Sequence, residues 1–164
     1  MKTKGNLPLF GVGPYYILFS FSLTFFSIYY TNSKSFIYYL PSFSLLFKIF
    51  SLIFIILAIV LWISAVFFNR ISSKIKQNQL VTTGAYSYVR HPIYSSFLLV
   101  HFAILLINGN IMLFPLLVIH WLILSLLLIN TEEKWLLQRY PNEYLSYSKH
   151  VNRCIPWFPL KKEK

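Results

Sequence analysis

Acidic residues are scarce in this chain: 4 of its 164 residues are acidic, 15 are basic, and only 12% are charged. A soluble domain of similar size has about 25% charged residues. Because 57% of the residues are hydrophobic, the composition favours a membrane protein. At about 20 apolar residues per spanning helix, the length accommodates four or five such helices. No separate water-facing catalytic domain fits in the remainder, so any chemistry must take place in or against the bilayer.

Cysteine is also nearly absent. Cys154 is the single cysteine, which excludes an intrachain disulfide and a CxxC-type metal site. Of its two interpretations, a reactive thiol and a small buried hydrophobe, we favour the second. His101 and His120 fall within apolar segments and could bind a metal together, but no third ligand has metal-like spacing. We expect a hydrogen-bonded pair between helices instead, and no metal site.

The excess of positive charge does not predict nucleic-acid binding. The basic residues lie in short segments between apolar runs, which is typical of cytoplasmic loops. Anionic lipid headgroups are the natural partner of such segments. We therefore expect membrane lipids as partners and no nucleic acid, and the sequence does not specify an oligomeric state.

Four apolar segments predict spanning helices, at residues 11–30, 49–68, 93–107 and 111–129. The sequence Asn108-Gly109-Asn110 is typical of a turn, so the last two should form an antiparallel hairpin. Residues 36–47 are too short to span comfortably and predict an interfacial segment. The basic start of the chain resembles a signal peptide, but it lacks a small-residue cleavage site and we expect it to be retained. The predicted fold is an all-α polytopic membrane bundle of four to five transmembrane helices, with residues 1–164 forming one domain.

Charge asymmetry predicts the orientation of the bundle. The segment 69–91 and the C-terminal tail are rich in lysine and arginine, whereas the turn at 108–110 has no charge. Because cytoplasmic loops carry the excess of positive charge, both termini and the middle loop should face the cytoplasm. We expect a multi-pass protein of a prokaryotic plasma membrane.

Beyond Ile129 the sequence predicts a C-terminal cytoplasmic helical segment. Glu132, Glu133, Leu136 and Tyr140 recur at helical spacing, and Pro141 should end that helix or start another. Residues 143–151 predict a second short amphipathic helix. Residues 155–159 combine proline, tryptophan and phenylalanine, which predicts an irregular aromatic segment at the membrane interface.

Arg90, His91 and Pro92 precede one apolar run, and Glu132 and Glu133 end the next. Taken singly, these residues could be a charged anchor, an interfacial histidine and a solvated helix exit. Together they place positive charge and a helix N-terminus opposite carboxylates on one side of the membrane. Ionisable groups beside a membrane segment are candidates for function, and this combination suits a ligand with both an ammonium and a carboxylate group.

The pattern of these residues resembles the isoprenylcysteine carboxyl methyltransferase family. The resemblance rests on the stretch LVTTGAYSYVRHPIY at residues 80–94, the glutamate pair, and the later residues Tyr144, Tyr147, Val151 and Ile155-Pro156. Phospholipid N-methyltransferases share the arginine-histidine-proline-x-tyrosine and paired-glutamate elements. The match covers residues 80–158, the expected cofactor-binding core, and residues 1–75 match only as generic membrane helices. Ser96 and Tyr140-Pro141 depart from the family pattern without removing a chemical group.

The resemblance implies an integral-membrane methyltransferase that uses S-adenosylmethionine without a Rossmann domain. The residues implied for its cofactor pocket are Gly84, Tyr86, Arg90, His91, Pro92, Tyr94, Glu132, Glu133, Tyr144 and Tyr147. A lipidic or prenylated carboxylate acceptor would need no general base, and Arg153, or less favourably Arg90, would clamp it. The alternative, a phospholipid amine, would need a base, for which we expect Glu133. A non-catalytic transporter or scaffold is the hypothesis from another class.

Overall fold

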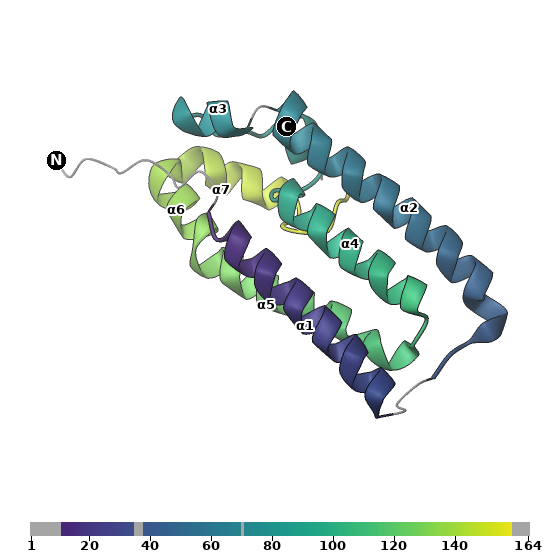
Figure 1. The fold of residues 1–164 in the computed structure, drawn as a ribbon. Helices are drawn as coiled ribbons and strands as arrows, with labels where there is room; N and C mark the ends of the chain where they lie inside the picture. Colours follow the sequence, from purple (N-terminus) through teal and green to yellow (C-terminus); the bar gives the residue numbers. More distant parts are fainter. Residues whose placement is uncertain (1–10, 35–37, 70, 159–164) are drawn as a thin grey trace.

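The computed structural model describes residues 11–34, 38–69 and 71–158, and most of them are helical (Figure 1). The α-helices are α1 (Gly13–Ser33), α2 (Ser44–Ile63), α3 (Ile71–Lys76), α4 (Pro92–Asn108), α5 (Pro115–Asn130), α6 (Glu132–Arg139) and α7 (Pro141–His150). Short turns of other helix types are η1 (Pro41–Phe43), η2 (Ser64–Phe68), η3 (Gly84–Ser87) and η4 (Ile111–Leu113). Two isolated bridges are the β-type pairings of the described residues, so the predicted all-α class is confirmed.

Two continuous helical stretches of the described residues are long and apolar enough to cross a membrane, Pro41–Phe68 and Ile111–Arg139. The apolar helix Pro92–Asn108 is shorter. Helix α1 has 21 residues and no charge, but its many tyrosines and serines lower its hydropathy and it is not among the candidates. Only 17% of the most apolar window of Pro41–Phe68 is buried, whereas the core helix of a soluble protein would be largely buried. The protein is an all-α membrane helix bundle, and the total of four to five crossings stays a prediction.

The segment before α2 differs from the prediction. Pro41 starts η1, which leads directly into α2, so residues 41–47 begin the second membrane helix and are not a separate interfacial segment. The prediction that this helix starts at Ile49 is wrong for the same reason. Proline is well tolerated in the first turn of a helix, where its missing N–H has no partner to lose. Residues 36 and 37 lie outside the described residues.

The predicted turn between α4 and α5 is confirmed. Gly109 ends α4 in the left-handed conformation, with φ of 72°, which glycine adopts without steric cost. The side-chain oxygen of Asn110 accepts hydrogen bonds from the backbone N–H groups of Met112 and Tyr38, each at 3.2 Å. The turn therefore also holds the chain that leads into α2.

Polar side chains link the helices inside the bundle. The rings of His101 and His120 stack with centroids 4.5 Å apart, and both are fully buried. Thr24 Oγ1 lies 2.9 Å from His120 Nε2 and 3.5 Å from His101 Nδ1. The predicted pairing of the histidines across the helices is confirmed, but the hydrogen bonds run through Thr24 of α1. Such contacts stabilise helix association where lipid supplies no hydrophobic driving force.

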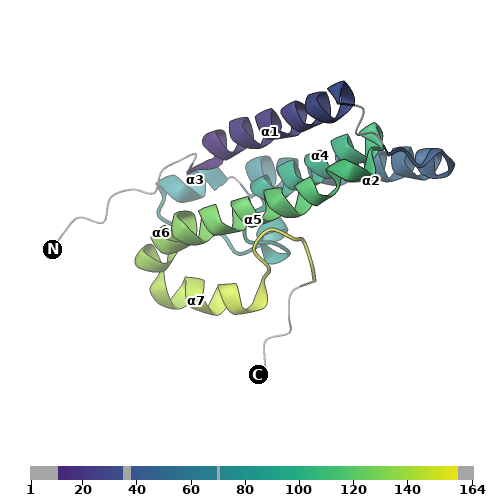
Figure 2. The ribbon, with the colours of Figure 1, turned by 90° about the horizontal axis from the view of Figure 1, so that it is seen from below.

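Helices α3, α6 and α7 gather at one end of the bundle, and the α4–α5 turn lies at the other end (Figures 1 and 2). Pro141 starts α7 after α6 has ended at Arg139, which confirms the predicted second short helix. The chain beyond α7 then turns back toward the start of α4, as Figure 2 shows. This end of the bundle brings together the motif residues that are far apart in the sequence.

Candidate active site

The backbone at the start of α4 pairs with the C-terminal segment (residues 151–158). The N–H groups of Arg90 and His91 donate to the carbonyl oxygens of Asn152 and Arg153 at 2.8 and 3.1 Å. Ser95 Oγ donates to the carbonyl oxygen of Cys154 at 2.6 Å. The two paired N–H groups belong to the N-cap His91 and the residue before it, so the pairing leaves the N–H groups of the first turn of α4 out of account, and an N-terminus open to an anionic ligand stays a prediction. This pairing brings Arg153 beside Arg90.

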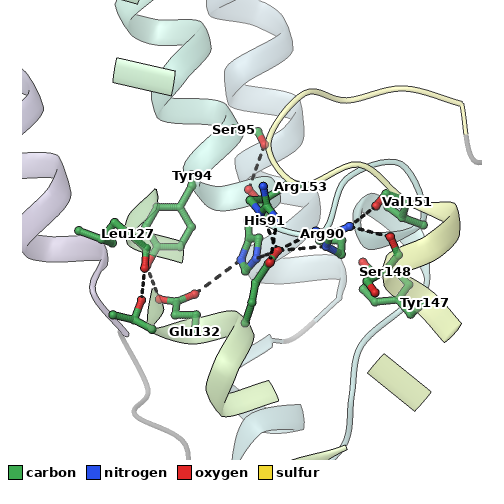
Figure 3. Close-up of polar contacts among 12 residues, drawn as sticks. Arg90, His91, Tyr94, Ser95, Leu127, Glu132, Tyr147, Ser148, Val151 and Arg153 are labelled. Carbon is green, nitrogen blue, oxygen red and sulfur yellow. Dashed lines mark hydrogen bonds and ion pairs between the residues drawn. The ribbon is translucent and has the colours of Figure 1, made fainter. Parts of the chain in front are cut away.

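Glu133 lies at the centre of a buried ion-pair cluster, defined here as Arg90, Glu133 and Arg153. Figure 3 shows the side chains of Arg90 and Arg153 close to His91. The Glu133 carboxylate accepts from Arg90 Nη2 at 2.7 Å and from Arg153 Nε at 2.9 Å. Arg153 Nη2 also donates to the second oxygen at 3.0 Å. The remaining guanidinium nitrogen of Arg90 donates to the carbonyl oxygens of Ser148 and Val151 at the end of α7. The cluster therefore joins α4, α6, α7 and the C-terminal segment.

Glu132 points to a different set of partners. Its Oε1 accepts hydrogen bonds from the Tyr94 hydroxyl and from the backbone N–H of Val12, the latter at 3.1 Å. Its Oε2 lies 3.6 Å from His91 Nδ1. The Glu132 side chain is 17% exposed and lines the cavity described below, and its Oε2 has a longer contact than its Oε1. Both glutamates contact residues 90–94, which confirms the proximity expected from their position at one membrane border.

A cavity of about 390 Å³ opens beside Glu132, which is within the usual range for small-molecule sites. One part of its wall is polar and aromatic, with Glu132, His91, Tyr94, Tyr140, Tyr144 and Tyr147. The other part is apolar, with Trp62, Val66, Ile75, Leu80, Ile93 and Phe97. The hydroxyl groups of Tyr140 and Tyr144 are buried without a hydrogen-bond partner in the described part of the chain. Buried polar groups are normally satisfied, but these two hydroxyls are closed off from solvent, so a ligand in the cavity would reach them only if neighbouring side chains moved.

Burial sets the protonation of several groups around the cavity. It raises the pKa of Tyr144 and of Tyr147, so both phenols keep their protons at neutral pH. Tyr147 donates to the carbonyl oxygen of Tyr86 at 2.5 Å. The hydrogen bonds that Arg153 donates to Glu133 raise the pKa of Arg153, so this guanidinium stays charged. Burial raises the pKa of the Cys154 thiol to about 12, which agrees with its interpretation as a small buried group.

The structure separates the predicted site residues into two sets. The cavity is lined by Tyr86, Arg90, His91, Pro92, Tyr94, Glu132, Tyr144 and Tyr147. Glu133, Gly84 and Arg153 are not among the residues that line it. Gly84 instead shapes the turn before Tyr86: its φ is 63°, and the side chain of Asn69 hydrogen-bonds the backbone on both sides of it.

Several lining residues were missed by sequence reasoning. Gly11, Gly13 and Pro14 close the cavity from the start of α1, and Trp62 and Val66 do so from α2 and η2. These positions lie within residues 1–75, where the sequence resembles the family only as generic membrane helices. Trp135 also lines the cavity, and its position three residues after Glu132 on a helix is a signal that could have found it.

Comparison with known proteins agrees with this arrangement. Residues 41–143 match the family model described as phospholipid methyltransferase. The chain belongs to this family, and the match includes α2 as well as the motif residues of α4 and α6.

Over 95 residues the chain is 34% identical to Protein-S-isoprenylcysteine O-methyltransferase of Schizosaccharomyces pombe, which covers 54% of this chain and 37% of that protein. The alignment therefore spans little more than a third of the length of this relative. No solved structure matches the chain.

Proposed function

We propose that this protein is an S-adenosylmethionine-dependent integral-membrane methyltransferase that acts on a membrane-embedded carboxylate or another lipidic group. The observation that supports this most directly is the cavity with one polar and one apolar part at the α6–α7 end of the bundle. A polar cofactor and an apolar acceptor can meet in such a cavity. The charge pattern supports a cytoplasmic position for this end of a multi-pass protein, and we infer a prokaryotic plasma membrane as its location.

The polar part of the cavity fits the cofactor that the family uses. S-adenosylmethionine, when bound, supplies a methyl group on a sulfonium sulfur, together with ammonium, carboxylate and hydroxyl groups. The Oε2 oxygen of Glu132 can accept from an ammonium or hydroxyl group. The hydroxyls of Tyr140 and Tyr144 are buried without a partner among the described residues, and they would donate to acceptor atoms of the cofactor only after neighbouring side chains had moved. Tyr86, His91 and Tyr94 would complete this part of the wall.

The chain's own contribution to the reaction would be positioning and exclusion of water. Tyr94 and the backbone N–H of Val12 fix one oxygen of Glu132 and so aim the other. The apolar residues from α2, η2 and α3 keep water from the reacting groups. Correct alignment of two reactants can lower a barrier by several kcal/mol. A carboxylate acceptor needs no proton transfer, so these residues would be sufficient for O-methylation.

The roles of the cluster residues follow from their partners. Arg90 lines the cavity, whereas Arg153 does not. The guanidinium nitrogens of Arg90 already donate to Glu133 and to the carbonyl oxygens of Ser148 and Val151, so Arg90 would have to leave these partners to hold an acceptor carboxylate. Arg153 and Glu133 bind each other outside the cavity wall, so either would have to leave this pair to act as a clamp or as a base. Amine methylation of a phospholipid with Glu133 as base is the alternative, and it would require that rearrangement.

Two measurements test the proposal. Purified protein should bind S-adenosylhomocysteine, and His91→Ala should weaken this binding while the protein stays folded. Incubation with a labelled methyl donor and lipid extract should then label a lipid, and its alkali sensitivity would distinguish an ester from a methylated amine. A folded protein that binds no S-adenosylhomocysteine would support a non-catalytic transporter or scaffold.

A further inference from the structure

A second cavity, of about 340 Å³, lies at the end of α7. Its wall includes Arg90, Lys149, His150, Asn152, Arg153 and Trp157. Arg90 also lines the first cavity, so this residue contributes to the walls of both. The first cavity is largely apolar, whereas this one is lined mainly by polar and charged groups of α7 and the C-terminal segment.

The charges around the second cavity are all of one sign. Three of its lining residues are lysine or arginine, and no acidic residue is among those that line it. Two nitrogens of Arg153 bind Glu133, whereas its Nη1 makes no hydrogen bond to any residue in the described ranges. The Arg153 side chain is 28% exposed, and Lys149 is exposed. The cavity thus has cationic donors available for an anion.

Large aromatic side chains form the rim of this cavity. Trp157 is 65% exposed and Phe158 is 77% exposed, although the backbone around them is anchored. The Trp157 N–H donates to the carbonyl oxygen of Tyr88 at 3.2 Å, and the ring of Phe158 meets that of Tyr88 edge-on. Tyr88 lies four positions before Pro92, the first residue of α4. The rim that contacts Tyr88 therefore lies where this apolar helix begins. Exposed tryptophan at that level is typical of the headgroup region of a bilayer.

We propose that the second cavity binds the phosphate of an anionic phospholipid, separately from the methyl acceptor. The free nitrogen of Arg153 supplies a directed hydrogen bond to a phosphate oxygen, and Lys149 supplies a compact charge. Trp157 and Phe158 contact the upper part of the acyl chains. The bound lipid holds the C-terminal segment against the membrane and, through Arg153, supports the ion-pair cluster. This site does not depend on the methyltransferase activity.

Lys149→Gln tests the proposal, with Lys134→Gln as the matched control, because Lys134 is an exposed lysine of α6 outside both cavities. The full-length protein is purified in neutral detergent, and retained lipid is counted by native mass spectrometry as phosphatidylglycerol or phosphatidylcholine is added. We expect one phosphatidylglycerol on the wild type and on the control, and about fivefold weaker retention in Lys149→Gln, as for the loss of one basic residue near an anionic surface.

Three outcomes would overturn the proposal. Equal loss of phosphatidylglycerol in both variants would show a diffuse charge effect without a defined site. Inorganic phosphate that displaces the retained lipid at millimolar concentration would identify free phosphate as the ligand. Equal retention of phosphatidylcholine and phosphatidylglycerol by the wild type would also contradict a phosphate site built from cationic groups, since the charged headgroup would then confer no advantage.

Discussion

Glu133→Gln removes the negative charge that Arg90 and Arg153 share while it preserves the shape of the side chain. The side chains of Arg90 and Glu133 are 8% and 9% exposed, so water cannot replace the lost partner at Arg90. Breaking a buried ion pair costs about 3–5 kcal/mol. Arg90 keeps its bonds to the carbonyl oxygens of Ser148 and Val151, and Arg153 is partly solvated. We therefore expect a loss near the lower limit, about 3 kcal/mol of unfolding free energy.

Thermal unfolding of the purified protein in detergent, followed by circular dichroism, measures this loss. For a chain of this size, 1 kcal/mol shifts Tm by about 2–4 °C, so Glu133→Gln should lower Tm by about 6–12 °C. Glu143→Gln is the matched control, since Glu143 is exposed in the first turn of α7 and should contribute less than about 1 kcal/mol. The double variant Glu133→Gln/Arg153→Gln should lose less than the sum of the single variants. A Tm for Glu133→Gln within two degrees or so of the control would refute the role of the cluster.

Three further predictions concern the turn, the tail and the topology. Gly84→Ala should lower stability by about 1–2 kcal/mol in the same assay because of its left-handed backbone and the adjacent Asn69 side chain; an unchanged Tm would contradict this. Truncation after His150 removes the carbonyl partners of the α4 start and should abolish S-adenosylhomocysteine binding while membrane insertion persists; binding by the truncated chain would contradict the site. Reporter fusions at Gly109 and at the C-terminus should give opposite signals, and equal signals would show an even number of crossings between them.

The helices that sequence analysis predicted best are those with local signals at both ends. The α4–α5 hairpin follows from two apolar runs, Pro92 at the start and Gly109 in the turn. The prediction at Pro41 was wrong because residues 41–47 were taken for a separate segment and not for the start of the second membrane helix. This error has a local cause: proline can break a helix or begin one, and only the packing of α2 decides between the two.

The candidate site was predicted in its residues more fully than in its geometry. Topology alone brings the glutamate pair to the motif at Arg90. Adjacent helical residues point about 100° apart, which requires the two glutamates to face different partners but does not say which one faces the cavity. The contact between Val12 and Glu132 had no signal, because it uses a backbone N–H group from 120 positions away.

The pairing of the C-terminal segment with the start of α4 has a consequence for biosynthesis. The carbonyl groups that receive the Arg90 and His91 N–H groups belong to Asn152 and Arg153, which are synthesised well after the start of α4. Domains generally form from the N-terminus during synthesis, so the apolar helices are inserted before these partners exist. Until Asn152 and Arg153 have been synthesised, Arg90 and Glu133 must rely on each other and on water at the membrane border. A chain stalled before these two residues would therefore be membrane-bound but unable to assemble the site.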